Sequence, residues 1–462
     1  MCQIQAFSWG ENLFPAFLAP DTTVLQEYPD TQQLRQISKQ LNSEYILIYT
    51  GTTKINISRN AILRLLQIAE MSDADLLYSD YYKTEQGQPV PHPTLDYQSG
   101  SLRDDFDFGP LILYRSSTFS GTVQQMEENY RYAALYDLRL RLSVSGNIIH
   151  LPEFLYSIEE TDFRLSGEKQ FDYVNPRNRM VQIEMEAACT AHLKSIGAWL
   201  PPDFKDIDLK TETFVTEASV IIPVRNRVRT IAEAVQSALN QQTDFPFNVI
   251  VVDNHSDDGT TELLQELCLN FPNLIHHLPE AQNLGIGGCW TTAIELPSCG
   301  KFAIQLDSDD LYNSRGVLQT IVDTFYQQNC AMVIGSYQMV NFHLEEIPPG
   351  IIDHREWTPD NGRNNALRIN GLGAPRAFYT PILRRMKFPN VSYGEDYATV
   401  LAISRNYRIA RIYQPLYLCR RWEENSDAAL DINRLNNNNF YKDKIRTFEL
   451  LCRKKQVCNK QN

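Results

Sequence analysis

Short apolar runs that end in polar segments mark the second half of the chain. Residues 218–224 read Ala-Ser-Val-Ile-Ile-Pro-Val and residues 247–252 read Phe-Asn-Val-Ile-Val-Val, which is typical of buried parallel strands. The residues between them place apolar side chains at helical spacing, and a further apolar run covers residues 302–306. Strand, helix and strand with polar strand ends predict an open α/β sheet whose ligands bind outside the carboxyl ends of the strands.

Three acidic residues, Asp307, Asp309 and Asp310, follow the last of these runs. In an extended chain Asp307 and Asp309 point to the same face and can share one hard cation, whose remaining positions are open to phosphate oxygens. A single Asp-x-Asp is also typical of a solvated turn, because turns favour Asp. The polar segments that accompany it favour the metal site.

Four blocks of the second half, taken together and in this order, resemble a family 2 glycosyltransferase with the A-type fold. They are Val-Ile-Ile-Pro-Val with Asn226, Val-Ile-Val-Val-Asp with Ser256, Asp257, Gly259 and Thr260, then Asp307-Ser308-Asp309-Asp310, and Gly394-Glu395-Asp396. The resemblance implies a Rossmann-like catalytic domain over residues 217–430.

The resemblance also implies roles for individual residues. It implies that Asp253 binds the base of a nucleoside-diphosphate sugar. Asp307 and Asp309 would hold ribose and a divalent cation, Mn²⁺ or Mg²⁺, on the diphosphate. Asp396 would be the catalytic base, with Glu395 beside it. The remaining candidates for donor binding are Pro223, Val224, Arg225, Asn226, Asp257, Asn283, Gly285, Ser308 and Arg421.

These residue types suit the transfer of a sugar. Negative charge grows on the diphosphate as the glycosidic bond breaks, and a cation held by Asp309 would stabilise it. The acceptor hydroxyl is a poor nucleophile at neutral pH, so a carboxylate such as Asp396 is needed to take its proton. Attack from the face opposite the leaving group inverts the anomeric configuration.

Two segments depart from the family pattern. Residues 289–291 read Cys-Trp-Thr where relatives continue toward Ala-Arg-Asn, so a familiar arginine is missing from the donor pocket. Residues 417–426 contain no His that could complete a metal site. Arg420 or Arg421 could clamp the diphosphate instead, because guanidinium pairs well with phosphate, although surface charge explains either residue equally well.

The first half of the chain resembles a shortened copy of the second. Residues 45–50 align with 302–307, and residues 135–137 align with 394–396 at nearly the same offset. The segment that begins at Thr50 offers hydroxyls but no carboxylate to a cation. We therefore expect residues 1–165 to form a truncated, degenerate and non-catalytic α/β domain that could bind a partner protein.

Within that domain, the segment from Arg103 to Gly109 could contact a glycan or the other domain. A charged loop with two buried phenylalanines is the favoured interpretation.

The remaining segments are predicted to connect and terminate these domains. Residues 166–216 contain a predicted helix at 182–194 and then a linker with Pro201-Pro202. Residues 431–462 predict a polar turn at 436–439, an amphipathic helix and a frayed tail. The basic residues of that helix could contact an anionic membrane peripherally, although a solvated face is favoured.

Composition narrows the classes of protein to which this chain can belong. The 462 residues are 43% hydrophobic, enough for two or more cores, and the net charge of −13 argues against a nucleic-acid partner. No apolar run approaches the roughly twenty residues of a membrane span. Nine cysteines without a Cys-x-x-Cys pair, and an N-terminus without a secretion pattern, predict a cytoplasmic protein.

The favoured function is a metal-dependent inverting glycosyltransferase that acts on a hydroxyl of a glycan, lipid-linked saccharide or protein. We expect the acceptor pocket around residues 370–376 and Glu395. A non-catalytic glycan-binding or scaffolding protein is the alternative. A nucleotidyltransferase is less favoured, because the chain has no glycine-rich opening loop that bears a lysine.

Overall fold

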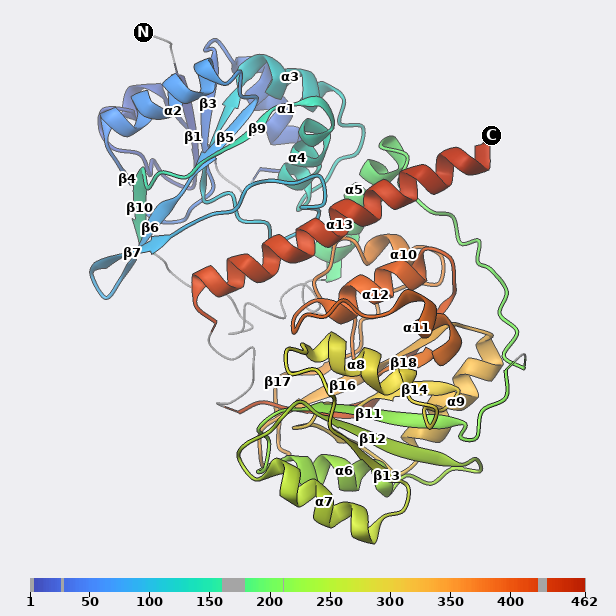
Figure 1. The fold of residues 1–462 in the computed structure, drawn as a ribbon. Helices are drawn as coiled ribbons and strands as arrows, with labels where there is room; N and C mark the ends of the chain where they lie inside the picture. The colour runs from blue at the N-terminus through green and yellow to red at the C-terminus, as the bar shows by residue number, and fades with distance from the viewer. Residues whose placement is uncertain (1–3, 26–28, 160–178, 211, 423–429, 462) are drawn as a thin grey trace. The chain divides into compact units, whose positions relative to one another are not determined.

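The computed structural model describes residues 4–25, 29–159, 179–210, 212–422 and 430–461 (Figure 1). The described chain forms two compact units. Of these residues, unit 1 contains 4–25, 29–159, 179–199 and 430–461, and unit 2 contains 200–210 and 212–422.

Unit 1 is built on a six-stranded sheet in the order β2-β1-β3-β8-β5-β9, in which β8 alone runs antiparallel to its neighbours. Every position of β3 is buried, as its continuous apolar run predicts. The strands are β1 (Ile4–Trp9), β2 (Thr22–Leu25), β3 (Tyr45–Tyr49), β5 (Leu76–Ser79), β8 (Leu111–Arg115) and β9 (Ile148–Leu151). A second sheet, in the order β4-β10-β6-β7, contains β4 (Asn56–Ile57), β6 (Tyr81–Glu85), β7 (Gln88–His92) and β10 (Tyr156–Glu159).

The helices of unit 1 begin at polar caps where the sequence offers them. Asp30 accepts a hydrogen bond from the backbone N–H of Gln33 at 2.8 Å, and Ser58 accepts one from Ala61 at 3.1 Å. The helices are η1 (Ala19–Asp21), α1 (Thr31–Gln40), α2 (Arg59–Met71), α3 (Ser116–Gln124), α4 (Ala134–Ser145), α5 (Arg179–Ser195) and α13 (Ile432–Gln461).

Buried charges fix α13 within unit 1. The carboxylate of Asp443 lies 3.3 Å from Arg103 Nε, 3.1 Å from Ser101 Oγ and 2.7 Å from Arg446 Nη1. Each of the four side chains is at most 3% exposed. The helix is therefore part of this unit's core, where the sequence predicted a separate tail.

Two details of that predicted tail are wrong. Residues 436–439 continue the helix and form no turn, and the Asn436 side chain donates to the carbonyl of Pro93 at 2.7 Å. Three of the basic residues offered for membrane contact, Lys442, Arg446 and Arg453, are buried. Their charges are held inside the unit, because Arg446 and Arg453 pair with acids of the same helix.

The segment from Arg103 to Gly109 has the structure that was favoured for it. Phe106 and Phe108 are buried and pack against each other, with ring centroids 4.6 Å apart. The guanidinium of Arg139 lies over both rings. Across the part of the chain that the structure describes, no helix combines the length and apolarity that a membrane crossing requires.

Unit 2 is built on a nine-stranded sheet in the order β13-β12-β11-β14-β18-β16-β19-β15, with β17 paired to β16. Strands β11 to β14 are parallel, and β18 runs antiparallel between β14 and β16. The strands are β11 (Ala218–Val224), β12 (Phe247–Asp253), β13 (Leu274–His277), β14 (Phe302–Gln305), β15 (Leu311–Tyr312), β16 (Met332–Val340), β17 (Glu346–Ile352), β18 (Arg376–Tyr379) and β19 (Ile409–Arg420).

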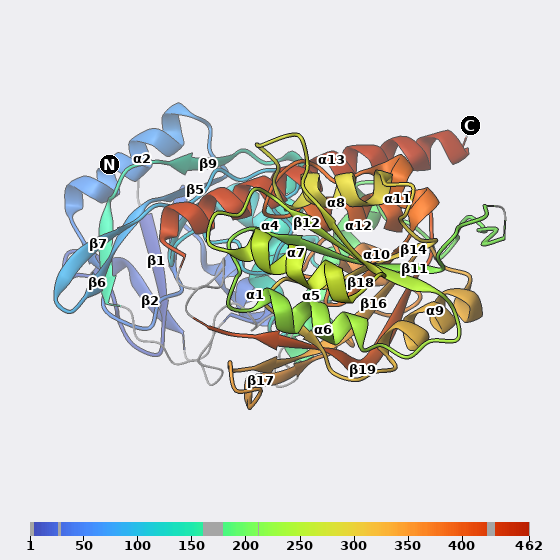
Figure 2. The ribbon, with the colours of Figure 1, turned by 60° about the horizontal axis from the view of Figure 1, so that its bottom comes forward.

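Helices cover this sheet, with α6 and α7 at the bottom in Figure 1 and at the front in Figure 2, and α8 above the sheet in Figure 1. The predicted order of strand, helix and strand is confirmed, and so is the α/β fold with a Rossmann-like parallel half. The helices are α6 (Ile231–Leu239), α7 (Thr260–Asn270), α8 (Ile286–Glu295), α9 (Val317–Gln328), α10 (Gly362–Asn365), α11 (Thr380–Met386) and α12 (Glu395–Ser404).

Candidate functional site

The register of the parallel strands brings the polar segments of unit 2 to one edge. Val224 at the end of β11 pairs with Asp253 at the end of β12, and Ile221 pairs with Gln305 at the end of β14. The predicted donor-binding segments at 223–226, 253–257 and 307–309 therefore leave the sheet side by side. This edge is where ligands of open α/β sheets bind.

Asn226 joins the first two of these segments. Its side-chain amide donates to Asp257 Oδ1 at 2.8 Å, and its Oδ1 accepts from the Asp257 backbone N–H at 2.9 Å. Its own N–H donates to Ser256 Oγ at 2.9 Å. Asn226 has a φ of 54°, a left-handed conformation that Asn tolerates better than most residues. Its role in the structure is to hold the two loops together.

Asp253, the residue predicted to bind the donor base, points into the protein. Its side chain is 0% exposed, and its oxygens accept hydrogen bonds from the Ser256 N–H at 3.0 Å and the Thr261 hydroxyl at 2.5 Å. His276 of β13 lies 3.2 Å away. Burial alone would raise the pKa of Asp253, but the bonds from His276, Thr261 and Ser256 hold it well below its usual range. In this conformation Asp253 organises the loop that follows it.

The next residue, Asn254, is directed differently. Its amide donates to the carbonyl of Leu284 at 2.8 Å, which ties the β12 loop to the start of α8. Its Oδ1 is buried and has no hydrogen-bond donor among the described residues. An unpaired buried acceptor at this edge is a natural partner for a donor group on a ligand.

The acidic block does not continue the strand, which corrects the extended geometry predicted for it. β14 ends at Gln305, and the chain turns so that the Asp310 N–H donates to the carbonyl of Asp307 at 3.2 Å. Asp307 then accepts from the side chain of Gln305 at 2.9 and 3.1 Å, and its N–H donates to Tyr417 Oη at 2.9 Å. Ser308 is buried within the turn.

The carboxylates of this turn influence one another. Burial raises the pKa of Asp309, and the charge of Asp307 raises it further. Burial raises the pKa of Asp310 well above its usual value, and Asp309 and Asp307 add to the effect. A hard divalent cation would relieve this repulsion, and carboxylate oxygens are suitable ligands for it.

The described residues hold no cluster of three or more protein ligands for a metal. A cation on Asp307 and Asp309 would therefore complete its coordination with oxygens of a bound ligand or of water, as Mg²⁺ commonly does.

Trp422 and Arg420 cover this turn from the end of β19. The indole N–H of Trp422 donates to Asp309 Oδ2 at 3.2 Å, and the guanidinium of Arg229 lies over the same ring, 5.0 Å from its centroid. Trp422 thus lies in the segment where the family pattern has a His. The residues that follow it, 423–429, lie outside the described residues.

The arginines proposed as diphosphate clamps are placed differently from each other. Arg420 is 1% exposed and bonds the carbonyl of Asp309 and the carboxylate of Glu233, while its N–H donates to Asp310 at 2.8 Å. It supports the acidic turn from inside, and its Nη2 is buried with no acceptor among the described residues. Arg421 is partly exposed, and its backbone N–H donates to Val340 at 2.8 Å.

A chain of hydrogen bonds connects Asp396 to the acidic turn. Asp396, near the start of α12, pairs with Arg376 Nη1, and Arg376 Nε donates to Gln305 Oε1 at 2.8 Å. The amide of Gln305 then reaches Asp307, as described above. The candidate base and the candidate metal ligand are thereby held in one network, although they are far apart in the sequence.

The predicted segment around Asn283 and Gly285 contributes by close packing. A Cβ atom on Gly287 would lie 2.0 Å from the carbonyl oxygen of Pro389 and 2.9 Å from the Cβ of Glu395. The Gly285 N–H donates to Asn390 Oδ1 at 2.7 Å, and Asn390 Nδ2 donates to the carbonyl of Asn283 at 3.3 Å. These contacts place the start of α8 against the loop that presents Glu395 and Asp396.

Among the residues of this site that sequence reasoning missed are Gln305, His276 and Trp422. Gln305 had a visible signal, because it is a polar residue within the apolar run 302–306. The other two became recognisable only when the fold brought β13 to Asp253 and the end of β19 to Asp309.

Comparisons with known proteins find a matching family and several relatives. Residues 219–390 match the family described as Glycosyl transferase family 2. A chondroitin synthase of Escherichia coli is 39% identical over 105 residues, which make up 22% of this chain and 15% of the relative. An uncharacterized glycosyltransferase of Rickettsia felis is 32% identical over 212 residues, or 44% of this chain and 32% of the relative.

Among solved structures, S. aureus TarS 1-349 in complex with UDP-GlcNAc is similar with 23% identity and a TM-score of 0.39, covering 51% of this chain and 72% of TarS 1-349. The mannosyltransferase PcManGT from Pyrobaculum calidifontis, in complex with GDP-Man and Mn2+, is 17% identical with a TM-score of 0.36, covering 62% and 84%.

The chain spans about a third or less of the length of these curated relatives. The region that matches the family contains β11 from its second residue, β12 to β14 and the acidic turn, and it ends at residue 390, before Glu395 and Asp396. Residues 219–390 are therefore a domain of glycosyl transferase family 2.

Proposed function

We propose that unit 2 transfers a sugar, with inversion, from a nucleoside-diphosphate sugar to a hydroxyl of a glycan, a lipid-linked saccharide or a protein. The observation that carries this proposal is the network from Asp396 through Arg376 and Gln305 to Asp307. It joins a carboxylate suited to proton removal to carboxylates suited to a diphosphate-bound cation, at the edge where nucleotides bind open sheets.

Asp396 is the base in this proposal. Arg376 donates to its Oδ2, and no hydrogen bond to its Oδ1 occurs among the described residues, so Oδ1 remains for the acceptor hydroxyl. The side chain is 26% exposed, which leaves it accessible to a substrate. As Asp396 takes the hydroxyl proton, the acceptor oxygen bonds to the anomeric carbon, and the bond to the diphosphate oxygen breaks. The nucleoside diphosphate leaves with that electron pair.

Asp307 and Asp309 are the residues that would hold Mn²⁺ or Mg²⁺. When bound, the cation supplies positive charge that stabilises the leaving diphosphate. The donor set fits, because it consists of hard carboxylate oxygens whose mutual repulsion a cation would relieve. Trp422 orients Asp309 through its indole N–H.

The donor base would meet the edge formed by the loops after β11 and β12. Asn254 offers a buried, unpaired Oδ1 there, whereas the carboxylate of Asp253 is already occupied. We therefore assign contact with the base to Asn254, with Asp253 as the residue that positions the loop. Unit 1 has no acidic turn in the corresponding place and is non-catalytic in this proposal.

A turnover experiment tests the proposal. The full chain is incubated with Mn²⁺ and uridine-, thymidine-, guanosine- or cytidine-diphosphate sugars, with a panel of oligosaccharide acceptors, and release of nucleoside diphosphate is measured. We expect turnover of one donor class and a loss of about 10²–10⁴-fold in Asp396→Asn, the usual contribution of a general base.

The matched control is Asp244→Asn, an exposed residue that precedes β12 and lies away from the carboxyl edge. Its turnover should equal that of the natural chain. Turnover of no donor, or equal turnover in Asp396→Asn and Asp244→Asn, would refute the proposal.

A further inference from the structure

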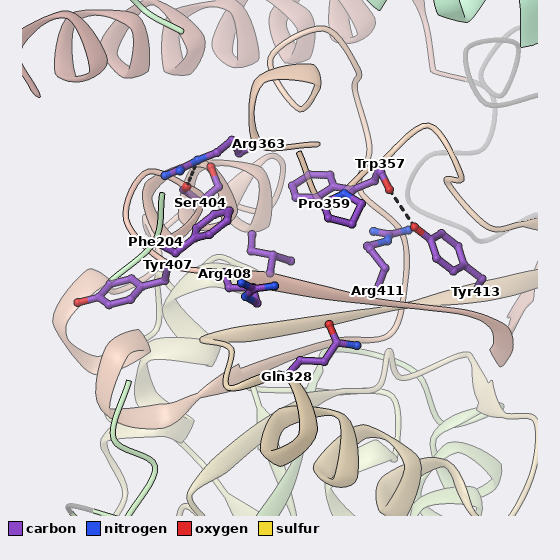
Figure 3. A pocket seen from close by; sticks show the side chains of 11 residues that line it. Phe204, Gln328, Trp357, Pro359, Arg363, Ser404, Tyr407, Arg408, Arg411 and Tyr413 are labelled. Atoms are coloured by element: carbon purple, nitrogen blue, oxygen red, sulfur yellow. Dashed lines mark hydrogen bonds between the residues drawn. The ribbon is translucent and has the colours of Figure 1, made fainter. Parts of the chain in front are cut away.

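Unit 2 contains a cavity of about 190 Å³ whose lining does not include the acidic turn (Figure 3). It lies between the loop after β17, the end of α12 and the first half of β19. Pockets for drug-sized ligands measure about 300–1,000 Å³, so this cavity suits a smaller group such as one saccharide residue.

Aromatic rings and guanidinium groups dominate the cavity wall. The guanidinium of Arg363 lies 4.5 Å and that of Arg408 5.4 Å from the ring centroid of Phe204, and Arg411 lies 5.9 Å from that of Trp357. Aromatic faces pack against sugar rings through their apolar surface, while guanidinium groups bind carboxylate and phosphate. Figure 3 shows Phe204, Arg363 and Arg408 on one side of the cavity and Trp357, Arg411 and Tyr413 on the other, so each side carries both kinds of side chain.

The cavity is positive, although the chain as a whole carries a net charge of −13. Eleven described residues line it, three of them are arginines and none is acidic. The nearby Glu356 is paired with His354 at 2.8 Å. Glu356 and Asp353, which do not line the cavity, still act on Arg411 through their charge, whereas Arg408 makes no ion pair among the described residues.

The three arginines differ in how many donors they have left for a ligand. Arg363 donates to the carbonyls of Ser404, Pro201, Asp203 and Arg405, so it supports the wall. Arg411 donates to two carbonyls, but its Nε is buried with no acceptor among the described residues. Burial lowers the pKa of Arg411 to about 10, although the charges of Glu356 and Asp353 oppose that shift. Arg408 is exposed at the opening and makes no ion pair among the described residues.

Two elements connect this cavity to the proposed transfer site. α12 carries Asp396 near its start and ends at Ser404, which lines the cavity, and its ten residues span about 15 Å. β19 lines the cavity with Arg411 and Tyr413 and then reaches the acidic turn with Tyr417. The cavity therefore lies at the opposite end of α12 from Asp396, about one helix length away.

We propose that this cavity is a subsite for an acidic saccharide residue, one that bears a carboxylate or a phosphate, within the acceptor chain. The proposal rests on the proposed function for its biological role. The binding event itself does not depend on catalysis.

Calorimetric titration of the full chain with glucuronate and glucose 6-phosphate tests the subsite, with glucose and inorganic phosphate as comparison ligands. Both acidic sugars should bind at least about tenfold more tightly than glucose or phosphate, a difference of about 1.4 kcal/mol. Arg408→Gln should weaken their binding by a similar factor. It should fold normally, because Arg408 is exposed.

Arg315→Gln, which removes an exposed arginine outside the cavity, is the matched control and should bind like the natural chain. Tyr413→Ala, a second exposed position, should also weaken binding of the acidic sugars. Equal binding in Arg408→Gln and Arg315→Gln, or phosphate alone binding as tightly as glucose 6-phosphate, would overturn the proposal.

Nucleotide binding measured in the same variants separates this result from the proposed function. Arg408→Gln should bind the donor nucleotide as the natural chain does. Loss of the subsite with nucleotide binding intact supports the inference, and nucleotide binding without any binding of acidic sugars refutes the subsite alone.

Discussion

The two units contain the same sheet with different chemistry at its edge. In unit 1 the order β2-β1-β3-β8-β5-β9, read along the sheet, matches β12-β11-β14-β18-β16-β19 in unit 2, with the same strand directions and the same order along the chain. The helices correspond as well, with α1 to α4 of unit 1 in the places of α8, α9, α11 and α12. Unit 1 has no counterpart of α6, α7 or β13 among its described residues.

The network of unit 2 is replaced by apolar side chains in unit 1. Gln305 and Arg376 adjoin each other at the ends of β14 and β18, and the corresponding pair in unit 1 is Ile48 and Ile112, which face each other across β3 and β8. Thr50 stands in the place of Asp307. The sheet is preserved because burial of its apolar residues stabilises it, and this does not depend on the polar edge.

The candidate base of unit 2 also has a counterpart with a different environment. Asp137, on α4, is 1% exposed and pairs with Arg141 of the same helix at 2.9 Å. Burial raises the pKa of Asp137. An aspartate at this position can therefore be purely structural, and it is the connection through Arg376 and Gln305 that distinguishes Asp396.

The largest predicted effect is a loss of stability in unit 1 while unit 2 still binds nucleotide. Asp443→Ala removes the buried carboxylate beside Arg446 and leaves Arg103 with Asp105 as its acidic partner, and a buried pair that loses one partner costs about 3–5 kcal/mol. Thermal denaturation should show a much lower transition for unit 1, while nucleotide binding by unit 2 persists. Lys444→Ala, an exposed neighbour on α13, is the control. Equal transitions in the two variants would contradict the assignment of α13 to the core of unit 1.

A smaller effect, on turnover, is expected when Gln305 of unit 2 is replaced by Ile, the residue at the corresponding position of unit 1. Gln305→Ile removes the bonds to Arg376 and Asp307, and turnover should fall about 10–100-fold, as for other partners that orient a metal ligand. Gln236→Leu, on the exposed face of α6, is the control and should retain full turnover. If turnover falls but nucleotide binding and its dependence on Mn²⁺ are unchanged, the network acts on Asp396 rather than on the cation. Unchanged turnover would show that the network has no role in the reaction.

The smallest predicted effect is on how the stability of unit 2 depends on pH. Since the pKa of Asp253 is depressed in the folded state, its bonds stabilise the fold above its ordinary pKa of about 3.9, and this contribution is lost as the pH falls below that value. Asp253→Asn should be less stable than the natural chain at pH 7 by about 1–3 kcal/mol, the cost of disturbing buried hydrogen bonds. The difference in stability should stay constant from pH 7 to about pH 5 and shrink toward pH 3, since its complete loss requires a pH below the depressed pKa of the folded state. A difference that stays constant down to pH 3 in melting curves would exclude the carboxylate as its cause.

The fold and the location of the site were largely predictable from local patterns. Runs of β-branched residues identified β11, β12 and β14, and acids at their ends identified the edge. The turn at Asp307 was not predictable, because the parity argument assumes that the strand continues. The inward direction of Asp253 depends on His276 and Thr261, which reach it only in the folded chain. The place of α13 depends on ion pairs such as Arg103 with Asp443, between residues too distant in the sequence for any local pattern to connect.

The most direct test of the account is the number of nucleoside diphosphates that the full chain binds. Uridine, thymidine, guanosine and cytidine diphosphates would be titrated calorimetrically, with and without Mn²⁺, into the natural chain, Asp309→Asn and Thr50→Ala. The account predicts one nucleotide bound per chain, dependent on Mn²⁺, lost in Asp309→Asn and retained in Thr50→Ala. Two nucleotides per chain, or binding that survives in Asp309→Asn, would contradict the claim that only unit 2 has a functional edge.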